Sequence, residues 1–391
     1  MRKRHEGKVL AVLGASAFQA PLIARARELG CEVHAFAWAC GDPGERLADE
    51  FHPVSTADRE AVLAACREAR ADGACTIGSD FNNAVATWVA NRLGLPANPD
   101  ECARLSTDKR AMRRALSAGG DPCPGFVAFR RGDDVAALAS GLRPPLVVKP
   151  ADRSGSRGVS LVGSRDGLAA AAEAALRESF CGAGVAEEYL EGDEYSVECV
   201  SWGGRHEALQ VTRKFTTGAP RFVETAHLQP CGLPPEADAR VRAAALHALG
   251  TLGVVQGASH AELRVGADGE PRIVEVGSRM GGDLIGSHLV PLSTGVDYVG
   301  AVVDAALGAE PDLSPRSRPR AAAVRFVLTG ADARALARLR DERPGLVVEA
   351  GWREPSGQEV TDSSARFGHC VMAAESADEL LPWLPGGEAD G

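Results

Sequence analysis

Two glutamates on either side of a strong turn signal are the first candidates for chemistry in this sequence. They lie in residues 259–283, SHAELRVGADGEPRIVEVGSRMGGD, where Asp268-Gly269 is a preferred two-residue hairpin turn. With this turn at the tip, Glu262 faces Glu275 directly, and we expect their Cβ atoms to lie about 4.5–5.5 Å apart. Opposed like charges destabilise a sheet unless a cation offsets them, and carboxylates suit Mg²⁺. Two solvated glutamates on an exposed hairpin face are the alternative.

A lysine followed by a run of small residues is the second candidate, in residues 145–163. A predicted strand ends in Lys149, and small residues behind it let backbone N–H groups approach an anion closely. The loop joins two predicted strands and lacks the spacing of a Walker A motif, so a flexible hairpin tip is the alternative. The small residues are Ser154, Gly155, Ser156 and Gly158.

Lys109 and Glu194 are further charged candidates. Lys109 lies in the first turn of a predicted helix, 106–118, with Ser106 as its N-cap. A lysine there opposes the helix dipole, which suggests a task for its charge, although most such lysines are solvated. Glu194 starts a predicted strand and could accept hydrogen bonds from ribose hydroxyls, or belong to an exposed polar face.

The substrate end of a site is less clearly marked. Glu224 and His227 are three residues apart in a stretch, 213–230, that we expect to be rich in loops, and a lone histidine is more often structural. Arg279 can grip a carboxylate or acyl phosphate bidentately. Asp283, four residues on, is either the N-cap of the following helix-like segment or a partner for a substrate ammonium group.

The order of predicted elements indicates an α/β protein. Within the first hundred residues, strands at 8–14, 32–38 and 75–80 alternate with helices at 19–29, 57–69 and 81–93. This alternation predicts βαβ units and a parallel sheet. Further helices are expected at 237–249 and 297–307, and the tail from residue 321 reads as strand, helix (332–340), strand, then a last strand and helix.

Composition narrows the class of partners. The chain has 391 residues, 45% hydrophobic and 25% charged, with a net charge of −10, which argues against nucleic acid as the main partner. It shows neither an apolar stretch of membrane-spanning length nor a secretory signal. The ten cysteines include no C-x-x-C pair, so we expect reduced thiols and a cytoplasmic location. A homodimer is left open.

Taken together, these motifs resemble the ATP-grasp superfamily of carboxylate–amine ligases. The likeness covers nearly the whole chain and is carried by TDK at 107–109, VVKP and SGSRGV at 147–159, EEYLEGDEYSVE at 187–198 and the carboxylate hairpin. FVETAH and EVGSRMGGD look most like the L-amino-acid ligase group, which forms dipeptides. The resemblance implies an α/β ATP-grasp fold with three parts: a Rossmann-like N-terminal domain (1–100), an ATP-grasp domain (101–310, lid about 146–200) and a small C-terminal α/β domain (311–391).

The resemblance also implies a role for each candidate residue. ATP would be held by Lys109, Lys149, the loop Ser154–Gly158, Glu187, Glu188, Leu190 and Glu194. Glu262 and Glu275 would hold Mg²⁺, two ions with Mn²⁺ as an alternative, and Lys149 and Arg279 would be catalytic. Glu224, His227, Arg279 and Asp283 would line the pocket for small-molecule carboxylate and amine substrates. The products would be ADP and phosphate.

One departure and two alternatives accompany this reading. Many members of the superfamily carry Asn two residues after the second metal glutamate, where this chain has Gly277, so the second ion would be held by a bridging Glu275 and water. The first alternative is a purine or one-carbon type ligase acting on glycinamide ribotide or bicarbonate, although residues 14–40 lack the basic cluster it would need. The second is a nucleotide-binding protein without catalysis, which would be expected to lose a metal carboxylate or Arg279.

Overall fold

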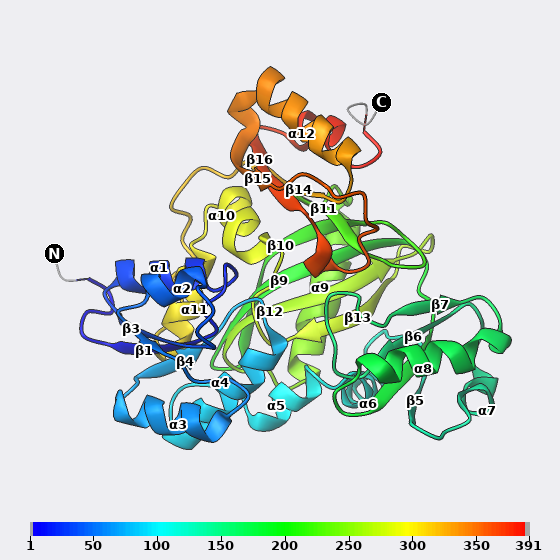
Figure 1. Cartoon of the computed structure of the whole chain (residues 1–391), viewed down its shortest axis with the longest axis horizontal. Helices are drawn as coiled ribbons and strands as arrows, with labels where there is room; N and C mark the ends of the chain where they lie inside the picture. The colour runs from blue at the N-terminus through cyan, green and yellow to red at the C-terminus, as the bar shows by residue number, and fades with distance from the viewer. Residues whose placement is uncertain (1–2, 388–391) are drawn as a thin grey trace.

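The N-terminal part of the chain forms a parallel four-stranded sheet with strand order β3-β2-β1-β4. The computed structural model describes residues 3–387, and this sheet lies on the left of Figure 1. The predicted βαβ alternation is confirmed, but the third predicted strand ends at Cys75, because Gly78 has a φ of 67° and Ser79 caps the next helix. The elements are β1 (Val9–Leu13), α1 (Ala20–Leu29), β2 (Glu32–Phe36), α2 (Pro43–Leu47), β3 (Glu50–His52), α3 (Arg59–Glu68), β4 (Gly73–Cys75) and α4 (Asp80–Leu93).

Two helices, α5 (Asp100–Leu105) and α6 (Lys109–Gly119), lead from this sheet into the next part of the chain. The predicted N-cap of α6, Ser106, is wrong. Asp108 caps the helix, with its carboxylate accepting from the backbone N–H of Arg110, while Ser106 ends α5. The Asp108 carboxylate at the helix start offsets the unfavourable position of Lys109, the first residue of α6.

A second four-stranded sheet, antiparallel with order β5-β8-β6-β7, lies at the lower right of Figure 1. We call it the lid sheet because it overlaps the predicted lid, although it begins at Phe126 and β9 of that range belongs to the central sheet. Leu168, Ala172 and Ala175 of α8 pack on Val148 of the sheet in one core. The loop between β6 and β7 carries the small residues 154–158. The elements are β5 (Phe126–Arg130), α7 (Val135–Leu138), β6 (Leu146–Pro150), β7 (Ser160–Val162), α8 (Leu168–Glu178) and β8 (Ala183–Glu188).

The central sheet has eight strands in the order β13-β12-β9-β10-β11-β14-β16-β15, all antiparallel. Its strands are β9 (Asp193–Trp202), β10 (Arg205–Thr216), β11 (Glu224–Gln229), β12 (Gly257–Val265), β13 (Pro271–Gly277), β14 (Ala321–Val327), β15 (Val347–Trp352) and β16 (Gly368–Ala374). Strand β11 pairs with β14, so the C-terminal segment continues the same sheet. The division at residues 100 and 310 stays a prediction.

The stretch 213–230 corrects a prediction. It is largely strand, since β10 runs to Thr216 and β11 begins at Glu224. Polar side chains of this stretch, including Lys214, line a cavity whose other walls also carry many charged residues. The sequence therefore lacks the alternation of apolar and polar residues that marks a half-buried strand.

The hairpin of β12 and β13 has the predicted pairing with a different turn. Glu262 lies opposite Glu275, as expected. The turn, however, is a five-residue loop between Val265 and Pro271, and a β-bulge near Ile273 supplies the extra residue that restores the register.

Helices cover the sheets and close the cores. Val241, Ala245 and Leu249 of α9 (Pro235–Thr251) pack against the central sheet. A π-turn (Ile285–Leu289) and α10 (Val290–Thr294) follow the hairpin, and α11 (Tyr298–Ala306) packs against the N-terminal sheet. The tail contains α12 (Gly330–Glu342) between β14 and β15 as predicted, but ends in 3₁₀ turns, Ala377–Glu379 and Leu381–Trp383, in place of the predicted last helix.

Within residues 3–387, every single helix falls short of the length and apolarity needed to cross a membrane; one bent pair, Ile285–Thr294 with Tyr298–Ala306, meets both measures by length and composition only.

Candidate active site

One cavity of about 410 Å³ gathers almost all of the predicted site residues. Its walls come from the lid sheet, the central sheet, the start of α4 and the loop before β16. Of the sixteen candidates only Gly158 lies outside the lining, at the base of its loop against Pro150 and Glu178. The residues brought together are Lys109, Lys149, Ser154, Gly155, Ser156, Glu187, Glu188, Leu190, Glu194, Glu224, His227, Glu262, Glu275, Arg279 and Asp283.

The opposed glutamates are each paired with a lysine. Glu262 accepts a hydrogen bond from Lys214 Nζ at 2.6 Å and lies 3.1 Å from His260 Nε2, while Glu275 accepts from Lys109 Nζ at 2.8 Å. Burial alone would raise the pKa of Glu262, but the Lys214 ammonium outweighs it and holds that pKa well below its usual range. Glu262 is therefore ionised, and a pair of opposed carboxyl groups is a donor set that fits Mg²⁺.

Lys214 is the hub of the acidic wall. Its Nζ lies 3.0 Å from Glu194, 3.7 Å from Glu224 and 2.6 Å from Glu262. Burial works to lower the pKa of Lys214, and the surrounding carboxylates, Glu262 first, raise it well above the ordinary value instead. A protein ammonium thus balances the carboxylates that the sequence had assigned to metal, ribose and substrate.

The second lysine belongs to a buried ion network. Glu187 Oε2 lies 2.8 Å from Lys149 Nζ, and Glu187 also accepts from Arg113 Nε at 2.8 Å. Burial opposes the charge of Glu187, yet Arg113 and Lys149 lower its pKa to about 2. Burial lowers the pKa of Lys149 itself, despite the neighbouring carboxylate. The Glu187 side chain is therefore occupied by Arg113 and Lys149. Any contact of this residue with adenine would have to come from its backbone groups.

The predicted nucleotide wall is held by an arginine. Arg264 donates to Glu194 at 2.9 Å, to the backbone carbonyl of Leu190 at 3.1 Å and to the Tyr189 hydroxyl at 2.7 Å. Its guanidinium also stacks over the Tyr189 ring, 5.1 Å from the centroid. Glu188, at the edge of this wall, accepts from the exposed Arg143.

The small-residue loop lines one side of the cavity. Ser156 has a φ of 59°, and its hydroxyl donates to the Phe222 carbonyl at 3.0 Å. Gly155 approaches Ser363 of the C-terminal segment. A single side-chain hydrogen bond from Ser156 to the opposite wall is an arrangement that can open at little cost in free energy.

Arg279 is held by a residue of the N-terminal sheet domain. It donates to both carboxylate oxygens of Asp80, at 2.7 and 3.0 Å. A Cβ added at Gly277 would lie 3.2 Å from Asp80 Oδ1 and from Arg279 Cζ, so the space next to residue 277 is already taken by this ion pair. Burial opposes the charge of Asp80, and Arg279 lowers its pKa.

At the far end of the cavity, Asp283 pairs with Arg366, and both face the buried ring of His227. The helix-cap alternative for Asp283 is wrong: its φ is 52°, and the following π-turn receives no side-chain cap. Among residues 3–387, neither His227 ring nitrogen has a hydrogen-bond partner, and Nε2 lies 3.9 Å from Asp283. Glu224 accepts from the Ser363 hydroxyl at 2.5 Å.

Sequence reasoning missed the residues that complete these charge pairs. Their partners lie far away in the chain, 199 residues for Asp80 and Arg279, 83 for Arg366 and Asp283, and 74 for Arg113 and Glu187. The only sign of these partners in the sequence was the excess of acidic over basic candidates. Buried carboxylates require cationic partners, so further lysines or arginines were to be expected in the site. The missed residues are Asp80, Arg113, Lys214, Arg264, Ser363 and Arg366.

Comparison with known proteins gives the same class as the fold and the site. The ATP-grasp domain family matches residues 142–287. D-alanine–D-alanine ligases from Cupriavidus necator and Polaromonas naphthalenivorans are 33% and 31% identical, over 54% of this chain and 66% and 68% of their own. Human carnosine synthase 1 is 28% identical over 81% of this chain and 41% of its own. A solved L-amino acid ligase from Bacillus licheniformis superposes with a TM-score of 0.79 and 25% identity, covering 96% and 95% of the two chains.

Fold, cavity and relatives together define an ATP-grasp protein. The chain belongs to the ATP-grasp family of carboxylate–amine ligases, which confirms the resemblance and the fold class expected from the sequence. It spans 66% of the length of the first of these D-alanine–D-alanine ligases and 41% of the human carnosine synthase.

Proposed function

We propose that the protein is an ATP-dependent ligase that joins an amino acid, or a similar carboxylate, to an amine and releases ADP and phosphate. The observation that carries the proposal is the opposed pair Glu262 and Glu275 in one cavity with Lys109, Lys149 and Arg279. The names of its relatives, D-alanine–D-alanine ligase, carnosine synthase and L-amino acid ligase, support amino acids as substrates.

The chemistry follows from the distribution of charge. A carboxylate is a poor electrophile at neutral pH, and transfer of the γ-phosphoryl group of ATP to it gives an acyl phosphate, which an amine can attack. Mg²⁺ held by Glu262 and Glu275 would neutralise charge on the transferring group. Lys109 and Lys149 would contact the phosphates, and Arg279 would grip the acyl phosphate bidentately.

The remaining walls would bind the nucleotide and keep water out. Glu194, oriented by Arg264, would accept hydrogen bonds from the ribose, and the backbone near Leu190 would contact the adenine. The loop 154–158 would close over the phosphates and protect the acyl phosphate from hydrolysis. Glu224, His227 and Asp283 would line the pocket for the amino-acid substrate.

The cofactor proposal is two Mg²⁺ ions, replaceable by Mn²⁺. Gly277 offers no side-chain ligand, so the second ion would be held by a bridging Glu275 and by water. All ten cysteines are unpaired thiols, which supports the proposal of a cytoplasmic location.

The purine-type alternative is not favoured by the N-terminal domain. Residues 14–40 contain two basic side chains, Arg25 and Arg27. Arg25 pairs with Asp297 at 2.7 Å and Arg27 with Asp49 at 2.9 Å. Both guanidiniums are thus already matched by carboxylates and offer no ready phosphate site.

The test is a screen of amino-acid pairs with ATP and Mg²⁺, read by phosphate release and product mass, in the natural protein and in Glu275→Gln. Loss of a residue one shell further from a metal costs about 10–100-fold, so loss of a direct ligand should cost more than about 100-fold. Glutamine can still accept from Lys109, so the fold should persist by circular dichroism.

Glu270→Gln is the matched control, because Glu270 lies on the exposed tip of the same hairpin. It should ligate at the natural rate. Natural turnover in Glu275→Gln at ordinary Mg²⁺ would remove the metal assignment, and the absence of phosphate release with every amino-acid pair would remove the proposed reaction.

A further inference from the structure

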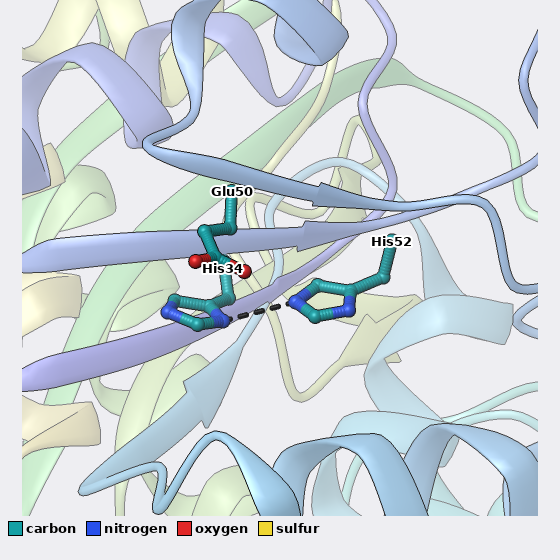
Figure 2. Close-up of side chains that lie close together, drawn as sticks. All are labelled: His34, Glu50 and His52. Atoms are coloured by element: carbon teal, nitrogen blue, oxygen red, sulfur yellow. Dashed lines mark hydrogen bonds between the residues drawn. The ribbon is translucent and has the colours of Figure 1, made fainter.

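A group of metal-ligating side chains lies in the N-terminal sheet, outside the active-site cavity. His34 on β2 and Glu50 and His52 on β3 project to the same face of the sheet (Figure 2). His34 lies opposite Glu50 in the parallel pairing of the two strands. His52 follows Glu50 by two residues and therefore points to the same side of β3. Because β3 is the edge strand, the group is open to solvent on one side.

The three side chains are close enough to share one ion. His34 Nδ1 lies 2.9 Å from His52 Nε2, and one ligand atom from each of the three residues lies within 4.8 Å of the others. Ligands at about 2.0–2.1 Å in a tetrahedral zinc site lie roughly 3.4 Å from one another. Small side-chain rotations therefore convert this group into three ligands of a tetrahedron.

A neighbouring carboxylate orients the His34 ring. His34 Nε2 lies 3.2 Å from Glu32 Oε1. A carboxylate accepts the N–H of an imidazole, so Nε2 carries the proton and the lone pair of Nδ1 points toward His52. Metal-ligating histidines characteristically donate their other ring N–H to a carboxylate in this way.

The ring of His52 is also fixed. It stacks on Phe36, with centroids 4.5 Å apart and an interplanar angle of 8°. This stack holds the His52 ring with Nε2 directed at His34 Nδ1, so both nitrogens are placed for one ion.

We propose that His34 Nδ1, His52 Nε2 and the Glu50 carboxylate bind one divalent transition-metal ion, with Zn²⁺ as the preferred ion and water in the fourth position. Two imidazoles and a carboxylate suit Zn²⁺, whereas Mg²⁺ prefers oxygen ligands. The site is separate from the proposed Mg²⁺ site. Its ion would tie the edge strand β3 to β2 and stabilise the folded state by mass action.

The experiment is a Zn²⁺ titration of the full chain against a chromophoric chelator, with excess Mg²⁺ present to occupy the oxygen-rich active site. We expect a Zn²⁺ equivalent that raises the thermal midpoint of unfolding. His52→Phe keeps a ring against Phe36 and removes the ligand, so it should weaken this equivalent at least about tenfold. Glu50→Gln, at an exposed position, should weaken it as well.

His247→Phe is the matched control, because His247 is an exposed histidine of α9, a helix outside the N-terminal sheet. It should bind Zn²⁺ like the natural protein. The proposal is overturned if the natural protein takes up no Zn²⁺ under these conditions, or if His52→Phe and Glu50→Gln both bind it with natural affinity and stoichiometry.

Discussion

Individual charged residues in the cavity are matched by protein partners before any substrate binds. Lys214 neutralises the acidic wall, Lys109 pairs with Glu275, and Arg366 pairs with Asp283. Each pair neutralises a buried charge whose desolvation would otherwise destabilise the folded protein. A charged substrate that binds here must therefore replace one protein partner of such a pair. The pair at the proposed amino-acid pocket is Asp283 with Arg366.

Asp283→Asn should raise KM for the amino-acid substrate about tenfold, equivalent to about 1.4 kcal/mol of lost binding, and leave KM for ATP unchanged. The reason is that asparagine cannot attract a substrate ammonium as a carboxylate does. Steady-state kinetics with each substrate varied in turn measures both constants.

Arg366→Gln and the double variant complete the test. In the free energy of unfolding, the two substitutions should show a coupling of about 0.5–3 kcal/mol, since the residues are in direct contact. If neither KM moves in Asp283→Asn, the residue is structural, and selectivity belongs to Glu224, His227 or other side chains.

At this scale the sequence predicted residue types better than their partners. Glu262, Glu275, Lys109 and Lys149 were singled out by hairpin register, helix position and a small-residue loop, and the structure places them in one cavity, while their roles stay a prediction. Asp80 could not be found, since it opens a helix in another part of the fold, and a single Asp at a helix start reads as an ordinary helix-terminal residue.

Among the elements, the lid strand β8 is fixed to the rest of the site by one buried carboxylate. Glu187 connects β8 to Arg113 of α6 and Lys149 of β6. Glu187→Gln should lower the free energy of unfolding by about 3–5 kcal/mol near neutral pH, because it leaves buried cations without their counter-charge. Denaturant titration measures the difference.

The same contacts of Glu187 predict that the free energy of unfolding depends on pH. The pKa of Glu187 is depressed from 4.5 to about 2 in the folded protein, so its contribution is fully present above pH 4.5 and is lost as pH falls toward about 2. The gap between natural protein and variant should close over that window. Glu188→Gln, which loses a partner as exposed as Arg143, should change stability by only about 0–1 kcal/mol. A gap that stays constant down to pH 2 would contradict the assignment.

The loop 154–158 should be a protease-sensitive element. Small residues and one anchoring hydrogen bond from Ser156 predict opening without nucleotide, and Arg157 offers trypsin a cleavage site. Mg-ATP should protect it, which limited proteolysis followed by mass spectrometry can measure. Cleavage at Arg131, in an exposed turn elsewhere in the lid, should be unaffected by ATP. Slow cleavage at Arg157 that ignores ATP would rule out a lid function.

The carboxylate hairpin shows both the reach and the limit of element prediction. The pairing of Glu262 with Glu275 was right although the two-residue turn was wrong, because the longer loop and the β-bulge shift the register in opposite directions. Strand period and turn preference are local signals, whereas a bulge depends on how the strand must bend within its sheet.

The whole molecule contributes to one site. The N-terminal domain supplies Asp80, the lid Lys149, the central sheet Glu262, and the segment after β15 Arg366. Asp80→Asn should therefore lower kcat about 10–100-fold, since a misplacement of Arg279 by about 1 Å is enough for a loss of that size. KM for ATP should change little.

Asp100→Asn provides the control, because Asp100 also pairs with an arginine, Arg92, but at an exposed position that does not line the cavity. The pH profile of kcat separates a positioning function from a purely structural one. If Asp80→Asn keeps natural kcat while its thermal midpoint falls, the ion pair with Arg279 only holds the domains together.

The continuous central sheet has a consequence for synthesis of the chain. Strand β14 lies between β11 and β16, and Arg366 immediately precedes β16. Because a chain leaves the ribosome from its N-terminus, Asp80, Lys149 and Glu275 emerge well before Arg366. The residues proposed to contact phosphate are thus made before the proposed amino-acid pocket is complete, so we expect ligation to begin only after the last strands of the sheet have been added.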